Sequence, residues 1–129
     1  FDDASKNLKT LIKTNKCSNC YLVGVDLGVA NLEGADLAGA NLRGARARCG
    51  IHLNGANFNG ADLRGFSSNN CIGFDLQGAN FRGANLKGAN LQYANLRGAD
   101  LTGVDLSEVN IEGADIAGAI VPNEAKSPK

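Results

Sequence analysis

The chain has 129 residues, and its 13 lysine and arginine side chains balance 13 aspartate and glutamate side chains. This zero net charge argues against a general nucleic-acid binder and against a uniformly acidic mimic of DNA. Only 5% of the residues are aromatic, which argues against an ordinary globular core, while 43% hydrophobic residues argue against disorder. No apolar run reaches the roughly 18–20 residues that a membrane-spanning helix needs.

The first predicted element is a helix over about residues 3–14. Leu8, Leu11 and Ile12 form an apolar stripe at i, i+3 and i+4 spacing. The stripe predicts that one side of the helix packs against the rest of the molecule. A helix lying on a membrane surface is the alternative, but three aliphatic side chains make a weak anchor. That alternative would use four lysines: Lys6, Lys9, Lys13 and Lys16.

A C-x-x-C pair, Cys17 and Cys20, follows the predicted helix. A zinc site would need two further ligands, and the sequence has neither a second C-x-x-C nor a pair of histidines. A thioredoxin-like redox motif would need a βαβ context, which is absent. The two cysteines are therefore interpreted as a structural disulfide or as thiols without a chemical role.

The rest of the chain is a five-residue repeat. From residue 30 it reads ANLEG ADLAG ANLRG, and from residue 79 it reads ANFRG ANLKG ANLQY ANLRG ADLTG. A period of five fits neither an α-helix nor a flat strand. Within a unit, Ala and Leu lie two residues apart and point to one side of an extended segment, while Asn or Asp points to the other. Glycine suits a corner because it tolerates unusual backbone angles.

This A-(D/N)-L-x-G motif, repeated from Cys20 to about Val121, resembles the pentapeptide repeat family. The resemblance implies an all-β solenoid, a right-handed quadrilateral β-helix of about five coils with four repeats per coil and a short N-terminal α-helix cap. The order of helix, C-x-x-C and repeats is similar to that of cyanobacterial and thylakoid-lumen members. The implied parts are a capping helix (1–16), the β-helix (17–121) and a C-terminal tail (122–129).

The central residue of each repeat is expected to fill the inside of the coil. These residues are Leu22, Leu27, Leu32, Leu37, Leu42, Ala47, Leu53, Phe58, Leu63, Cys71, Leu76, Phe81, Leu86, Leu91, Leu96, Leu101, Leu106, Ile111, Ile116 and Val121.

Two breaks interrupt the repeat, near residues 46–51 and 66–70. The first is a one-residue insertion near Cys49. The second is a three-residue insertion, which we assign to Phe66 and the two serines after it. With four repeats per coil, the two breaks lie on one face in successive coils. This placement predicts a Cys49–Cys71 bridge, with Cys71 as a small core residue being the alternative.

No catalytic, cofactor or metal site is expected. His52 is the chain's one histidine and occupies an outward Asn/Asp position, where a solvated side chain needs no partner. The aspartates belong to the same outward column, which argues against a metal. The glycines form corners and precede no helix, so they do not form a phosphate-binding loop. These features predict that the protein is not an enzyme.

The charges separate along the chain into a basic middle and an acidic end. Residues 43–97 hold seven basic side chains against Asp62 and Asp75, whereas residues 98–116 hold five acidic side chains and no basic one. A mixed, solvated surface accounts for this pattern, and a binding surface on the middle coils is the sharper hypothesis. The candidate partner surface is Arg46, Arg48, His52, Phe66, Asn69 and Asn70.

Three functions follow as hypotheses. The first is a rigid rod that binds a protein partner. The second is a gyrase-directed DNA mimic, as some relatives are, which the neutral charge and the short rod disfavour. The third is a redox sensor that uses Cys49 and Cys71. We expect no nucleic-acid partner and no membrane insertion, a monomer rather than a dimer, and the periplasm or thylakoid lumen rather than the cytoplasm.

Overall fold

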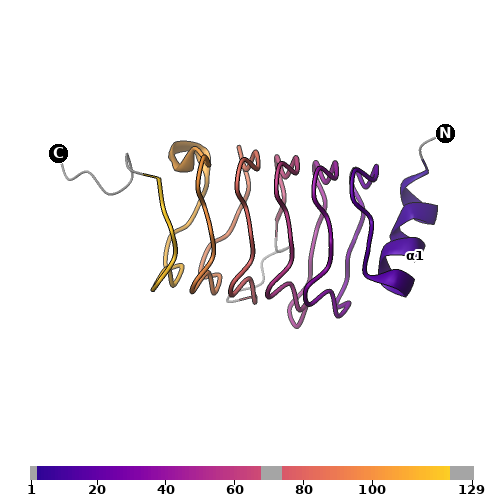
Figure 1. Ribbon diagram of the computed structural model, residues 1–129, viewed down its shortest axis with the longest axis horizontal. Helices are drawn as coiled ribbons and strands as arrows, with labels where there is room; N and C mark the ends of the chain where they lie inside the picture. Colours follow the sequence, from indigo (N-terminus) through magenta and orange to yellow (C-terminus); the bar gives the residue numbers. More distant parts are fainter. Residues whose placement is uncertain (1–2, 68–73, 123–129) are drawn as a thin grey trace.

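The computed structural model describes residues 3–67 and 74–122 and forms a rod of stacked coils (Figure 1). The element order is helix α1 (Ala4–Thr14) followed by the coils, which include one short 3₁₀ helix, η1 (Leu106–Glu108). Helix α1 lies at the N-terminal end of the stack, and η1 lies near the opposite end. Most of the tail expected at 122–129 falls outside the described residues.

Helix α1 begins one residue after the expected start because Asp3 caps it. The Asp3 side chain accepts a hydrogen bond of 3.1 Å from the Lys6 backbone N–H. Asn15 ends the helix in a left-handed conformation, with φ of 64°, and its backbone N–H donates to the Leu11 carbonyl. Leu11 is wholly buried and Leu8 is partly buried against the core, as the apolar stripe predicts, but Ile12, the third member of the stripe, is 55% exposed.

Isolated parallel β-bridges pair residues in successive coils and define four faces. Paired residues are 20 apart at the start of the chain, 21 or 23 apart across the two insertions, and 20 apart again beyond them. The first face joins Lys16, Asp36, Asn57, Asn80, Asp100 and Ile120; the second joins Tyr21, Asn41, Asp62 and Asn85; the third joins Asp26, Arg46, Ser67, Asn90 and Asn110; the fourth joins Asn31, His52, Asp75, Asn95 and Asp115.

The coils are named here by their residues and the corners by the face that they follow. The first coil is 16–35, the second 36–56, the third 57–79, the fourth 80–99 and the fifth 100–119. The first corner follows the first face, and so on to the fourth.

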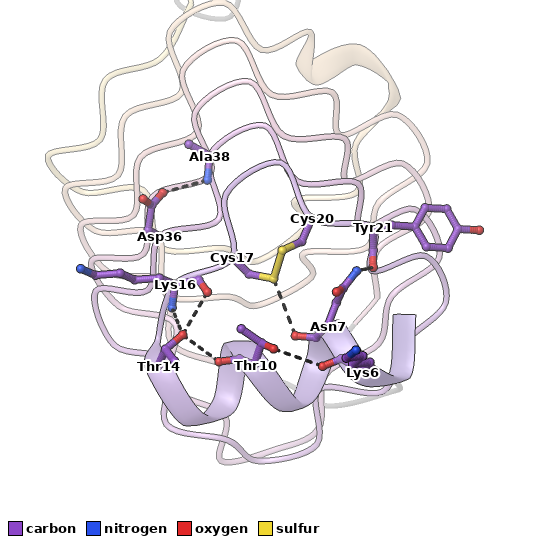
Figure 2. The surroundings of a disulfide bond; sticks show 10 residues. All are labelled: Lys6, Asn7, Thr10, Thr14, Lys16, Cys17, Cys20, Tyr21, Asp36 and Ala38. Carbon is purple, nitrogen blue, oxygen red and sulfur yellow. Dashed lines mark hydrogen bonds between the residues drawn. A yellow bond between two sulfur atoms is a disulfide. The ribbon is translucent and has the colours of Figure 1, made fainter. Parts of the chain in front are cut away.

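The repeat motif makes its own corners. The side chain of Asp36 accepts a hydrogen bond of 3.2 Å from the Ala38 backbone N–H, two residues on (Figure 2). Asn57 does the same with the Asn59 N–H at 3.0 Å. Glycine then closes the turn in the left-handed region, as at Gly65 with φ of 71°. The alternation of Asn and Asp in this column follows, because both supply the same acceptor oxygen.

The core is a column of the predicted central residues with the alanines that precede them. Leu22, Leu42, Leu53, Leu63 and Leu86 are all at most 2% exposed. The rings of Phe58 and Phe81, central residues in successive coils, stack with their centroids 5.1 Å apart and their planes 8° apart. Each coil therefore buries its apolar side chains on the coils above and below it.

The assignment of Phe66 as an inserted residue was wrong. Phe66 follows Gly65 without a change of register and takes the small-residue position, where it is 2% exposed and packs on Phe74. Ser67 pairs with Arg46 and with Asn90 of the neighbouring coils, so it is a regular member of the third face. The additional residues therefore come after Ser67. Cys71, which was predicted as the central residue of this repeat, lies outside the described residues.

The fifth coil is more open than the others. Its predicted central residues Leu106 and Ile111 are only partly buried, and Ile116 is 42% exposed. Glu108 stands where the corner has glycine in other coils, and the chain turns there through η1. At the opposite end, Cys17 takes the central position of a first repeat that was not predicted, and it is 4% exposed.

Candidate interaction surface

The two insertions share the third corner. Arg46 pairs with Ser67 before the corner, and His52 pairs with Asp75 after it. Both insertions therefore lie between the third face and the fourth face. This agrees with the expected juxtaposition of the two breaks. Insertions stacked on a rigid scaffold place non-repetitive side chains at one location on the rod.

Among the described coils, the third corner has glycine at its turn position only in the fifth, at Gly113. Its turn position holds Val29 in the first coil, Cys49 in the second and Tyr93 in the fourth. The first, second and fourth corners have glycine at this position throughout the described coils, except at Asn19 and Glu108. The third corner is therefore a ridge of side chains in the first, second and fourth coils, although Gly28 and Gly50 lie next to the substituted positions.

Two of these side chains are exposed and apolar. Val29 is 60% exposed and Tyr93 is 42% exposed. Tyr93 adopts a left-handed φ of 60°, which costs a residue with a side chain roughly 1–2 kcal/mol. Its ring lies over Gly113 of the next coil, where it leaves no room for a Cβ atom. An exposed aromatic side chain in an unfavourable backbone conformation is a candidate binding residue.

Of the six candidate surface residues, three are exposed. These are Arg46 and Arg48 on the third face and its corner, and His52 at the start of the fourth face. Phe66 is buried and does not contribute to any surface. Asn69 and Asn70 lie outside the described residues. Val29 and Tyr93 were not predicted as surface residues, although each replaces the glycine of its repeat and could have been identified for that reason.

Arg48 is bound to an aspartate of the previous coil. Its Nε and Nη2 atoms donate to Asp26 Oδ2 at 3.2 and 2.7 Å. The hydrogen bonds from Arg48, together with one from the Gly28 backbone N–H, lower the pKa of Asp26. The Arg48 side chain is nevertheless 61% exposed. Arg48 thus presents an oriented charge at the ridge.

Basic side chains of the fourth coil form ion pairs with acidic side chains of the fifth. Arg82 and Asp100 are 3.3 Å apart on the first face, and Arg97 and Asp115 are 3.1 Å apart on the fourth. At the second corner, Lys87 and Glu108 are 3.7 Å apart. At the third corner, Gln92 Nε2 donates to Glu112 at 2.9 Å. Much of the basic and acidic separation in the sequence is therefore complementary pairing between two adjacent coils.

The Cys17 and Cys20 sulfurs form a disulfide beside helix α1 (Figure 2). Asn7 of α1 contacts both flanks of this bond, since its side chain donates to the Tyr21 carbonyl and its own carbonyl lies 3.7 Å from Cys17 Sγ. Cys49 is also disulfide-bonded. Its predicted partner, Cys71, lies outside the described residues.

Neither a metal site nor a membrane span is evident in the part of the chain that the structure describes. Within 3–67 and 74–122, no group of three or more His, Cys, Asp or Glu side chains is arranged to hold a metal ion. Helix α1 is too short and too polar to cross a membrane, and the described residues contain no other helix that is long and apolar enough to do so.

Comparison with known proteins relates the sequence to one family. The family model described as pentapeptide repeats matches in eight copies over residues 16–48, 49–83, 66–103 and 84–121. No curated protein gives a match.

Several solved structures are similar to the chain. The pentapeptide repeat protein Rfr23 from the cyanobacterium Cyanothece 51142 is 33% identical over 92% of this chain and 99% of that chain, with a TM-score of 0.39. A pentapeptide repeat protein from Nostoc PCC 7120 is 27% identical over 93% and 97%, with a TM-score of 0.49. One from the Arabidopsis thaliana thylakoid lumen is 30% identical over 84% and 66%, with a TM-score of 0.34.

Proposed function

Because the chain belongs to the pentapeptide repeat family, whose members are generally non-enzymatic repeat proteins, we propose that it is an interaction module: a rigid rod that binds a protein partner. The family fold is a right-handed quadrilateral β-helix. In this proposal about five coils form the rod and helix α1 caps its first coil. The burial of Leu11 against the core supports the cap, since an uncovered coil would expose an apolar edge.

The observation that carries the proposal is the ridge at the third corner. Val29 and Tyr93 replace the glycine of the repeat there, Arg46 takes an Asn/Asp position, and Arg48 takes the variable position. All four side chains are exposed. Tyrosine and arginine are enriched at protein interfaces, where they act as anchors with the apolar side chains around them. We define the third-corner surface as these four residues.

The test is affinity capture from the source cell with mass-spectrometric identification. The double variant R46E/R48E is expected to lose the captured partner, while its circular dichroism spectrum stays that of the wild type. K6E/K9E is the matched control, because it makes the same charge change on exposed lysines of α1. Capture that survives R46E/R48E, or that is lost equally in both variants, would show that this surface is not the docking site.

The gyrase-directed alternative has less support. A DNA mimic needs a continuous array of free carboxylates, but on the fifth coil Asp100, Glu108 and Asp115 are paired with cations. We expect no inhibition in a DNA supercoiling assay. Inhibition at low micromolar protein would favour the alternative over the interaction module.

The disulfides support an oxidising compartment as part of the proposal. Cytosolic thiols are generally kept reduced, whereas Cys17, Cys20 and Cys49 are all disulfide-bonded. The periplasm or the thylakoid lumen fits this state. Alkylation of thiols in freshly lysed source cells is expected to leave these cysteines unmodified unless a reductant is added first. Labelling without a reductant would argue for the cytoplasm.

A further inference from the structure

Arg43 and Arg46, three residues apart in the second coil, have no carboxylate within ion-pair distance among the described residues. We propose that these two guanidinium groups bind the carboxylates of an acidic peptide segment in the protein partner. The inference rests on the proposed interaction function and names the chemistry of the partner. Arg43 lies outside the third-corner surface, so the inference extends the binding site to the second corner.

The nearby carboxylates are already occupied by other arginines. Asp26 accepts two hydrogen bonds from Arg48. Asp62 accepts from Arg64 Nε at 2.9 Å and from Nη2 at 2.7 Å. Such paired contacts match the planar fork of arginine to one carboxylate. The four arginines and two aspartates of this region therefore leave a surplus of two positive charges, on Arg43 and Arg46.

The surface between the two surplus arginines is formed by glycines of the second corner. Arg43 precedes the glycine of the second corner, and Arg46 begins the third face just beyond it. At Gly44 and at Gly24 of the first coil, a Cβ atom would meet nothing within 4 Å. Arg46 Nη1 makes a long hydrogen bond of 3.3 Å to the Gly24 carbonyl, which directs its guanidinium across this corner. A polypeptide backbone can therefore approach the two glycines, with the Arg46 guanidinium beside it.

The surroundings favour an acidic peptide over a nucleic acid. A phosphate backbone gains affinity from many cations in a row, whereas here only two are unpaired and Asp26 and Asp62 flank them. The flanks also offer apolar contact. Tyr21, 37% exposed, pairs with Asn41, which lies two residues before Arg43. A segment with two carboxylates near an aromatic or aliphatic residue matches this arrangement.

The probe is a blocked synthetic peptide, acetyl-EEDYDEE-amide, with acetyl-QQNYNQQ-amide as its uncharged counterpart. Peptide is titrated into the ¹⁵N-labelled protein while the arginine Nε–H signals are recorded by NMR. The Arg43 and Arg46 signals are expected to shift, and R43Q/R46Q is expected to weaken binding at least about tenfold. K6Q/K9Q is the control that removes two exposed lysines of α1, and its binding is expected to match that of the wild type.

Three results would overturn the inference: binding that is unchanged in R43Q/R46Q, equal binding of the uncharged peptide, or tighter binding of an oligothymidine of the same charge. Each of these results concerns the acidic segment alone, and capture with R46E/R48E still tests the interaction function separately. If R46E/R48E abolishes capture of the partner but no acidic peptide binds, the acidic segment is wrong and the third-corner surface stands. If the peptide binds as described but capture ignores R46E/R48E, the docking site proposed for the partner is wrong.

Discussion

The basic side chains of the second coil and of the fourth coil look alike in the sequence but have different partners. In the fourth coil, Arg82, Lys87 and Arg97 each meet a carboxylate of the fifth coil. In the second coil, Arg43 and Arg46 meet none among the described residues. A positive stretch of sequence therefore says little about binding until the pairing of its charges is known. Here the fourth coil uses its charge internally, and the second coil retains a surplus.

The difference reflects how the two regions are packed. The second coil lies inside the rod, where Leu42 and Leu53 are fully buried between neighbouring coils. The fifth coil has its central Ile116 partly in solvent, so less apolar burial holds it in place. Side-chain contacts from the fourth coil, at the first face, the second corner, the third corner and the fourth face, supplement this weaker packing. The account predicts that the two regions respond differently to the same kinds of substitution.

The largest expected effect comes from apolar truncation. Leu86→Ala removes a side chain that is 2% exposed, and we expect a loss of about 2–5 kcal/mol in the free energy of unfolding. Ile116→Ala in the fifth coil is expected to cost about 1 kcal/mol or less, because that side chain already contacts water. Urea unfolding measures both values. Equal losses would contradict the contrast between the inner coils and the fifth coil.

Loss of the N-terminal disulfide is expected to have a smaller and local effect. Cys20→Ser opens a loop with a sequence separation of three, for which loop-closure entropy gives at most about 2 kcal/mol. Hydrogen exchange should rise in α1 and the first coil, where Asn7 contacts the flanks of the bond. Exchange in the fifth coil should stay unchanged. A rise spread over the whole rod would show that the coils do not respond separately.

Removing the fourth-coil cations tests the charge comparison itself. The triple variant R82Q/K87Q/R97Q is expected to increase amide hydrogen exchange several-fold over residues 100–121. The matched variant R43Q/R46Q should leave exchange over residues 100–121 unchanged, because neither side chain forms an ion pair with the fifth coil. High salt should reproduce the first effect in the wild type. Equal exchange in both variants would refute the assignment of distinct roles.

The smallest expected effect is on acid stability. Hydrogen bonds from Thr102 and, to a smaller extent, from Arg82 lower the pKa of Asp100. Hydrogen bonds from the Ala117 backbone and, to a smaller extent, from Arg97 lower the pKa of Asp115. The unfolded chain binds more protons than the native state below the ordinary aspartate pKa of 3.8, so stability falls as the pH drops through that range. R82Q/K87Q/R97Q should show a shallower decline in thermal unfolding between pH 4 and 2. An identical decline would mean that the arginines do not set these pKa values.

Much of the fold was predictable because the repeat is regular. Most of the column of central residues follows from the period of five, and helix α1 follows from the spacing of Leu8 and Leu11. Phe66 was misassigned because a phenylalanine at a small-residue position looks like an insertion. Its register depends on the pairing of Ser67 with Arg46, which is a contact between coils.

The candidate surface was predictable only in part. Arg46, Arg48 and His52 are exposed because they occupy outward repeat positions, which the period determines. The ion pairs were not predictable, since partners such as Arg97 and Asp115 are 18 residues apart in sequence and meet only when the coils stack. The surplus at Arg43 emerged only after the nearby carboxylates had been assigned to other arginines.

The most direct test of the charge account is the exchange of arginine Nε protons with water in the free protein, measured by ¹⁵N NMR. Arg48 and Arg64 donate these protons to carboxylates, so their signals are expected to exchange slowly. Arg43 and Arg46 have no such acceptor in the described structure, so their signals are expected to exchange several-fold faster. If Arg43 and Arg46 exchange as slowly as Arg48 and Arg64, the second coil has no surplus charge and the account is wrong.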